Sequence, residues 1–333
     1  MWRSIDTPVG LLQLWHFWLA VMVLQLTSAV LSAQNVGEPR KLAPRVLTVI
    51  PVEPEEAETV SGPRAVVEIV RGIADLEWNP HFSSESVTLR EIAKRTIYRR
   101  TIWNLEFSFK PLRMIRVDIP QSNGRMRRKL IWYLVYRVRN SGGHLEPIAK
   151  EDDFGNRTFD PEPVDYGLHF FPHFVLETKT QKKAYLDQLI PIAIEPIQQR
   201  EDPNTKLHNT VSIGEVDLKP NNDPNDHGVW GVATWQDIDP RIDFFSIYVQ
   251  GLTNAYQFED PEGAFSEGDP PGTGRKYTLK TLQLNFWRPG DSIQEHEDEI
   301  RFGVPVETDS DRQKDVLSQY GLQKRLDYLW LYR

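Results

Sequence analysis

The sequence predicts a mainly β protein, built as one or two antiparallel β-sandwiches with a C-terminal helix. Apolar and polar side chains alternate in several short stretches, which is the period of a half-buried strand. Turns rich in Pro, Gly, Asn and Asp separate these stretches. No regular alternation of strands with long helices is seen, which disfavours a parallel α/β sheet. With 333 residues, 40% of them hydrophobic, the chain can bury a sizeable core.

The clearest strand pattern is a hairpin between residues 105 and 139. In its first half apolar residues occupy odd positions, and Pro111 interrupts the alternation, which predicts a bulge or two shorter strands. Its second half, residues 130–138, is apolar on both faces and predicts a central strand. The pair Asn123-Gly124 lies between the halves and favours an antiparallel turn.

Further strands and short helices are expected along the chain. The strand candidates are residues 169–178, 228–235, 243–252, 276–287 and 299–306. A short helix is expected over residues 89–98, and Pro191 and Pro196 allow only short helices that start at them. The C-terminus predicts a helix from about Asp311, ended or kinked at Gly321, with an extended final stretch as the alternative.

The stretch from Trp132 to Gly143, WYLVYRVRNSGG, generally resembles immunoglobulin-like and fibronectin-like strands. The resemblance covers a dozen residues and identifies no family. It implies that the expected sandwiches are immunoglobulin-like.

The N-terminus predicts export. Arg3 precedes an apolar run over residues 19–31, and Ala33 gives the small residue that a signal peptidase needs. We expect a signal peptide over 1–33, with an uncleaved membrane anchor as the alternative, and a Pro/Glu-rich tether over 34–65.

Three further segments follow the tether. These are a β-sandwich domain with the basic hairpin over 66–204, a second sandwich or second half of the same one over 205–308, and a C-terminal helix over 309–333. An exported chain without cysteine suits a bacterial envelope, so we expect a periplasmic or extracellular protein.

Composition excludes several chemistries. The absence of cysteine excludes disulfides, thiolate metal sites and thiol nucleophiles. The net charge of −8 and the export signal disfavour nucleic acid as a partner. Oligomeric state is left open.

Charge is unevenly distributed. Residues 90–139 carry fourteen Lys and Arg against three Asp and Glu, a local excess of +11, which leaves about −19 for the rest of a chain of net charge −8. The hairpin tip supplies the expected partner-binding residues Arg125, Arg127, Arg128 and Lys129, for an acidic protein, an anionic polysaccharide or lipid headgroups. The alternative is that these charges serve solubility and pair with acidic residues of the same chain.

Other motifs argue against enzymatic sites. Residues 269–276 approach a phosphate loop but have Asp269, Arg275 and Lys276 where Gly, Lys and Ser or Thr are needed, so no nucleotide and no cofactor is expected. The loop 221–228 lacks a Glu at the twelfth position of a calcium loop, and His169 with His173 lacks a zinc-protease pattern. No catalytic or metal residue is therefore assigned.

The leading interpretation is an exported, non-enzymatic structural or interaction protein of the bacterial envelope. The alternative is a carbohydrate-active protein, either a glycan binder using tryptophans or a hydrolase using a carboxylate pair. The candidate stacking residues are Trp103, Trp230, Trp235, Trp287 and Trp330.

Overall fold

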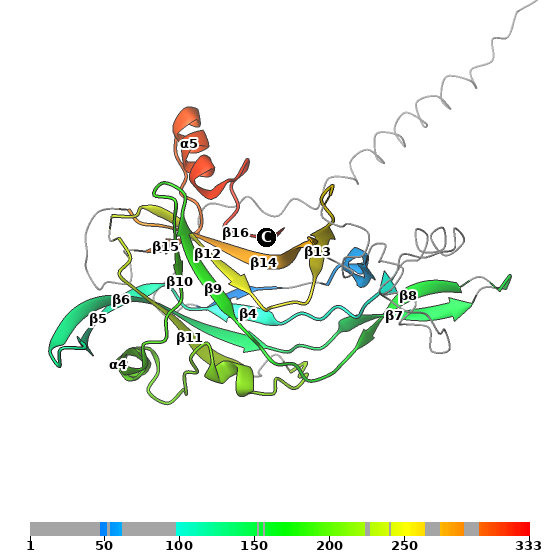
Figure 1. The fold of residues 1–333 in the computed structure, drawn as a ribbon, viewed down its shortest axis with the longest axis horizontal. Helices are drawn as coiled ribbons and strands as arrows, with labels where there is room; N and C mark the ends of the chain where they lie inside the picture. The colour runs from blue at the N-terminus through cyan, green and yellow to red at the C-terminus, as the bar shows by residue number, and fades with distance from the viewer. Residues whose placement is uncertain are drawn as a thin grey trace, which may run out of the picture. The chain divides into compact units, whose positions relative to one another are not determined.

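The central strand of the fold is β6 (Met126–Arg139), as its two apolar faces predict (Figure 1). The computed structural model describes residues 47–51, 54–61, 98–151, 153–155, 157–223, 227–239, 241–263, 274–289 and 300–333. All of them belong to one of two units into which the chain divides, Pro39–Arg333. Strand residues make up 46% of the described chain, so the prediction of a mainly β protein is confirmed.

The first large sheet is antiparallel and has the order β1-β4-β6-β11, with β5 also paired to β6. Its other strands are β1 (Thr48–Ile50), β4 (Glu106–Phe109), β5 (Arg113–Pro120) and β11 (Val229–Gln236). β4 and β5 share the edge of β6 that faces away from β11, and residues 110–112 separate them. The predicted interruption at Pro111 is thus confirmed.

The second large sheet has the order β10-β9-β12-β14-β13, with β15 and β16 also paired to β14. Its strands are β9 (His173–Thr178), β10 (Lys183–Leu186), β12 (Phe244–Gln250), β13 (Tyr256–Glu259), β14 (Lys276–Trp287), β15 (Arg301–Phe302) and β16 (Tyr328–Tyr332). Two pairs stand apart from both large sheets: β2 (Val60–Ser61) with β3 (Tyr98–Arg99), and β7 (His144–Glu151) with β8 (Arg157–Val164).

One hydrophobic cluster takes side chains from both large sheets. Trp132 of β6 contacts Phe245 of β12 with ring centroids 5.5 Å apart, and Tyr136 of β6 contacts Phe174 of β9 at 4.9 Å. Burying such aromatic side chains supplies much of the apolar area that stabilises a β fold.

The other face of β6 packs on the helix α4 (Pro191–Glu201). Ile131 and Tyr133 share a second hydrophobic cluster with Ala193 and Ile197 of this helix. The expectation that Pro196 would start a helix is wrong, because α4 begins at Pro191 and runs through it. Pro196 removes only one helical hydrogen bond, and burial of the apolar side of the helix offsets that loss.

Both alternatives for the C-terminus occur, one after the other. The helix α5 spans Ser310–Tyr320, one residue earlier than expected, because the Asp309 side chain caps it by accepting hydrogen bonds from two backbone N–H groups. It ends at Gly321, whose φ of 70° is left-handed, and the extended strand β16 follows. Within the described ranges, neither helix combines the length and the apolar content needed to traverse a bilayer.

Two strand candidates are shorter than expected. Residues 169–172 precede β9 rather than belong to it, since Pro172 cannot donate to a ladder, and residues 299–306 supply only β15. The signal peptide 1–33, most of the tether 34–65 and nearly all of the helix candidate 89–98 lie outside the described residues.

Candidate functional site

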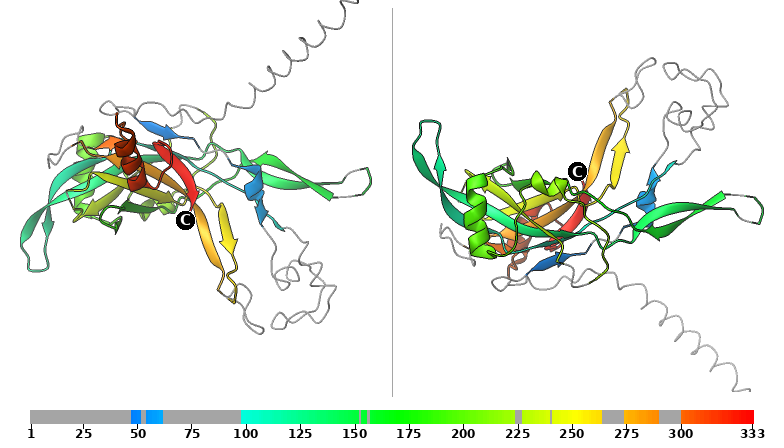
Figure 2. Two further views of the ribbon diagram at one scale, coloured as in Figure 1. Left: turned by 90° about the horizontal axis from the view of Figure 1, so that it is seen from above. Right: turned by 90° about the horizontal axis from the view of Figure 1, so that it is seen from below.

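The basic hairpin continues past the sheet as a two-stranded ribbon (Figures 1 and 2). β11 pairs with β6 no farther than the Gln236–Ile131 pair, and β4 pairs only with its other end. Among the described residues, β5 and β6 therefore have only each other as ladder partners over residues 116–129. We name residues 116–129 the basic ribbon; its sequence carries five Lys and Arg against one Asp, a net charge of +4.

The turn at its tip follows from Asn123 and Gly124. The backbone N–H of Gln121 donates to the Arg125 carbonyl at 2.8 Å, and Gly124 donates back to the Gln121 carbonyl at 2.9 Å. The Asn123 side chain accepts from the Arg125 N–H at 3.0 Å, and Gly124 has a left-handed φ of 77°. The predicted turn is confirmed, and it fixes where the arginines emerge.

Three of the four predicted partner-binding residues are exposed on this ribbon. Arg125, Arg127 and Arg128 are open to solvent, and within the described part of the chain their guanidinium groups form no hydrogen bond or ion pair. Lys129 is different, because its Nζ lies 2.8 Å from a carboxylate oxygen of Asp237. The structure therefore separates a paired lysine at the root from three exposed arginines at the tip.

Four basic residues of the sheet and of its neighbouring turn are paired with carboxylates of the same chain. Arg137 and Arg139 of β6 both pair with Glu106 of β4, at 3.6 and 2.7 Å. Lys110 and Arg113 both pair with Glu201, at 3.5 and 2.7 Å. Intramolecular pairing, the alternative in the sequence analysis, thus holds for the sheet, whereas the ribbon tip keeps exposed charge.

Glu201 anchors the root of the basic ribbon. Its side chain and that of Arg113 are each only 2% exposed, and the Tyr133 hydroxyl donates to the same carboxylate oxygen at 2.8 Å. Burial, with the Glu201 charge as a second cause, raises the pKa of Tyr133 well above its usual range. This buried ion pair joins the end of α4 to the start of β5.

A second ribbon of opposite charge is formed by β7 and β8. Residues 144–164 carry six Asp and Glu against two Lys and Arg, a net charge of −4, and we name them the acidic ribbon. Glu146 lies directly opposite Glu162 in the register. Lys150 pairs with Asp160 at 3.2 Å and with Glu162 at 3.0 Å, and these bonds, Glu162 first, raise its pKa.

Sequence reasoning missed the acidic ribbon. Three prolines in residues 144–164 argue against strands. The turn-forming run from Asp152 to Asn156 between two segments of equal length was the pattern that could have revealed it.

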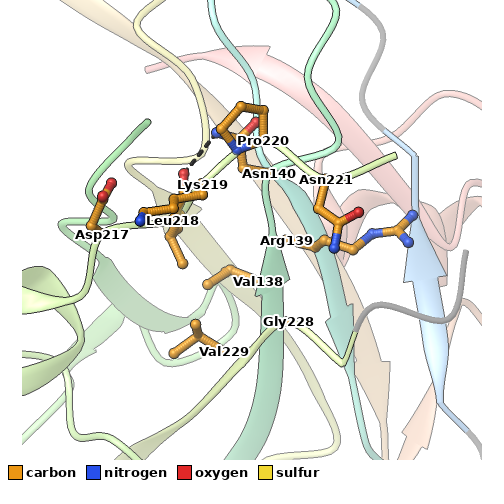
Figure 3. A pocket seen from close by; sticks show the side chains of 10 residues that line it. All are labelled: Val138, Arg139, Asn140, Asp217, Leu218, Lys219, Pro220, Asn221, Gly228 and Val229. Carbon is orange, nitrogen blue, oxygen red and sulfur yellow. Dashed lines mark hydrogen bonds between the residues drawn. The ribbon is translucent and has the colours of Figure 1, made fainter. Parts of the chain in front are cut away.

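A polar pocket of about 340 Å³ lies at the end of β6 (Figure 3). The Asn140 side chain donates to the backbone carbonyl of Leu218 at 2.8 Å, which ties the segment 217–221 to the sheet. Asp217 is the one carboxylate in its lining, and Arg139, also in the lining, is paired with Glu106. Among the described residues, the lining therefore lacks the two carboxyl groups that glycoside hydrolysis needs.

The other motifs fall into structural roles or outside the described residues. Residues 269–273 of the phosphate-loop candidate are outside them, and Lys276 begins β14, as the alternation predicted. Of the Asx-rich loop, residues 224–226 are outside them. The described residues contain no group of three His, Asp or Glu suited to a metal.

The two histidines of the pair have separate partners. His169 Nδ1 lies 3.1 Å from the Gly214 carbonyl, and His173 Nδ1 lies 3.2 Å from the Gln250 side chain. They therefore do not share one binding centre.

The candidate stacking tryptophans are not exposed. Trp235 is fully buried in the main core, and Trp103 and Trp330 are partly buried against it. Trp230 is partly buried against the second cluster, and Trp287 is also half-buried, under the guanidinium of Arg301 at 5.1 Å. None of the five is more than partly exposed.

Comparison with known proteins gives no relative: no family model, no curated protein and no solved structure matches the chain.

Proposed function

We propose that this chain is an exported, non-enzymatic interaction protein of the bacterial envelope, which docks through its basic ribbon onto an acidic partner protein. The observation that carries the proposal is the group of three exposed arginines on a turn held by backbone hydrogen bonds. Exposed arginine on a pre-organised element loses little conformational entropy when it binds carboxylates.

The way in which the root of the basic ribbon is held also supports a docking role. The buried Arg113–Glu201 pair and the packing of α4 hold its root, so the tip projects from a fixed base. An interaction site on such a base keeps its geometry better than a site on a free loop.

We also propose that the two large sheets form an immunoglobulin-like sandwich. This is supported by the hydrophobic cluster to which strands of both sheets contribute, and by antiparallel pairing throughout them. Such a scaffold suits an interaction protein because its strand ends and hairpins are free to carry binding residues.

The carbohydrate-active alternative has less support. Its two requirements were exposed tryptophans and a cleft with paired carboxylates. The five tryptophans are buried or half-buried, and the pocket of Figure 3 has one carboxylate in its lining.

The test replaces the tip charges and measures association with the envelope. The variant R125Q/R127Q/R128Q should co-sediment with isolated envelope about tenfold less at low salt, because surface charge pairing is screened only weakly there. The control K206Q/R312Q/K324Q removes the same charge from three other exposed positions and should behave as the unmodified chain. Equal association of all three proteins would overturn the proposal.

A further inference from the structure

We infer that the acidic partner is a second copy of this chain: the basic ribbon of one molecule docks on the acidic ribbon of the next. The inference rests on the docking role proposed above for the basic ribbon. It identifies the partner from the positions of the two ribbons in the fold and from the amount and spacing of their charges.

The two ribbons lie at opposite ends of β6 (Figures 1 and 2). The basic ribbon includes the start of β6, and β7 begins at His144, shortly after β6 ends at Arg139. A strand of fourteen residues is about 45 Å long at ~3.3 Å per residue. The basic ribbon of a molecule therefore cannot reach its own acidic ribbon, but it can reach that of a neighbour.

The charges of the two ribbons are complementary in amount and in spacing. The basic ribbon carries +4 and the acidic ribbon −4. Arg127 and Lys129 occupy alternate positions of β6, as do Asp160 and Glu162 of β8. Alternate residues point to the same face about 7 Å apart in any strand, so the two rows of charge match when the ribbons lie along each other.

The acidic ribbon is incompletely neutralised within one molecule. Glu146 and Glu162 lie directly opposite each other, an arrangement that destabilises an isolated strand pair. Among the described residues of that face, Lys150 is the one Lys or Arg beside Glu146, Asp160 and Glu162. An arginine from a neighbouring molecule would relieve this repulsion.

Prolines indicate that the ribbons meet through side chains and not by strand addition. The backbone N–H and C=O of Leu145 bond to Ile102, on the side of β7 away from β8. Pro147, two residues later, therefore places its ring nitrogen on that same outer edge, where no N–H is then available to a further strand. The exposed carboxylates on the face of the ribbon remain for docking.

A contact between two different surfaces of identical molecules is head-to-tail. Such contacts form a closed ring where the rotation between copies closes and an open chain where it does not, and in an open chain each added copy leaves one basic and one acidic ribbon free. Exposed charge pairs are individually weak, so we expect joints that form and break with salt and concentration.

The experiment measures the mass of the full chain, as recovered from cells, by sedimentation equilibrium. At about 20 mM salt the average mass should rise with protein concentration, and at about 0.5 M salt it should return to that of one chain. The variant R125E/R127E/R128E should bind itself at least tenfold more weakly. The variant E146K/K150E/D160K/E162K inverts the acidic stripe while keeping its internal ion pairs, and should lose self-association equally.

Mixing the two variants is the decisive measurement. R125E/R127E/R128E changes the basic ribbon from +4 to −2, and E146K/K150E/D160K/E162K changes its four-residue stripe from −2 to +2. The docking charges within each variant then have like sign, but the reversed charges of each are complementary to the unchanged ribbon of the other. An equimolar mixture should recover the salt-sensitive mass increase that neither shows alone. Failure of the mixture, or a single-chain mass for the unmodified protein up to about 100 µM, would overturn self-docking.

Failure of this inference can be told apart from failure of the proposed function. A protein that stays a single chain, but loses envelope association in R125Q/R127Q/R128Q, has a different acidic partner. If the protein stays a single chain and R125Q/R127Q/R128Q associates with the envelope as the unmodified chain does, then both self-docking and the proposed function fail.

Discussion

Breaking the buried ion pair under the basic ribbon should cost far more stability than the pair itself contributes. Arg113 Nη1 and Glu201 Oε1 are 2.7 Å apart, and both side chains are 2% exposed. At an effective dielectric constant of about 20, that separation gives an attraction of about 6 kcal/mol. Desolvation of several kcal/mol per ion offsets most of it. R113M leaves the Glu201 charge buried with less compensation, and should destabilise the fold by about 3 kcal/mol.

The assay is urea unfolding followed by tryptophan fluorescence, with R113M, E201M and R113M/E201M compared. Each single variant should lose about 3 kcal/mol, and the double variant should lose clearly less than the sum, because neither charge is left behind. K314M, which removes one member of the exposed Lys314–Asp311 pair, serves as the control and should show no measurable change. Additive losses in the double variant would refute the reasoning.

Three further predictions concern the core, the pH response and the C-terminal helix. F174A removes a ring that contacts aromatic side chains of β4, β6 and β11, and should cost about 3–5 kcal/mol of unfolding free energy in urea. Burial lowers the pKa of His144, so the unfolded chain takes up its proton first and stability should fall as pH drops through about 6.5. The urea midpoints at about pH 7.5 and about pH 5.5 should differ less in H144F than in the unmodified chain. Some difference should remain, because burial also lowers the pKa of His208. D309A removes the cap of α5 and should cost about 1 kcal/mol, and equal melting curves for D309A and the unmodified chain would contradict the capping role.

The local patterns of the sequence predicted the longer strands of the large sheets, but not the short strands β1, β10 and β13. β6 reads as apolar on both faces because both faces are covered, one by the second sheet and one by α4. β14 occupies residues 276–287, as its alternation predicts. In these segments the apolar side chains that pack in the core are also those that produce the alternating pattern, so the pattern predicts the strand correctly.

The acidic ribbon could not be predicted in the same way, because its prolines are tolerated for a reason that depends on pairing. In a two-stranded ribbon every second residue points its backbone outward, and Pro147 and Pro161 lie opposite each other at such positions. The sequence shows the prolines but not which edge is open.

The candidate site was predicted only in part for a related reason. The four predicted basic residues all lie within residues 125–129, so charge counting found them. Glu201, which pairs with Arg113, is 88 residues away from it, and Asp237 is 108 residues from Lys129. Which basic residues are neutralised depends on contacts between distant segments, which no local pattern encodes.

β6 also has a mechanical consequence. If copies join through their ribbons, tension between neighbours runs along one continuous strand. The hydrogen bonds between β6 and its flanking strands are then perpendicular to the force. They are loaded in shear, so they must break together instead of one at a time. A chain of such molecules would bear load through its cores and would part first at the joints.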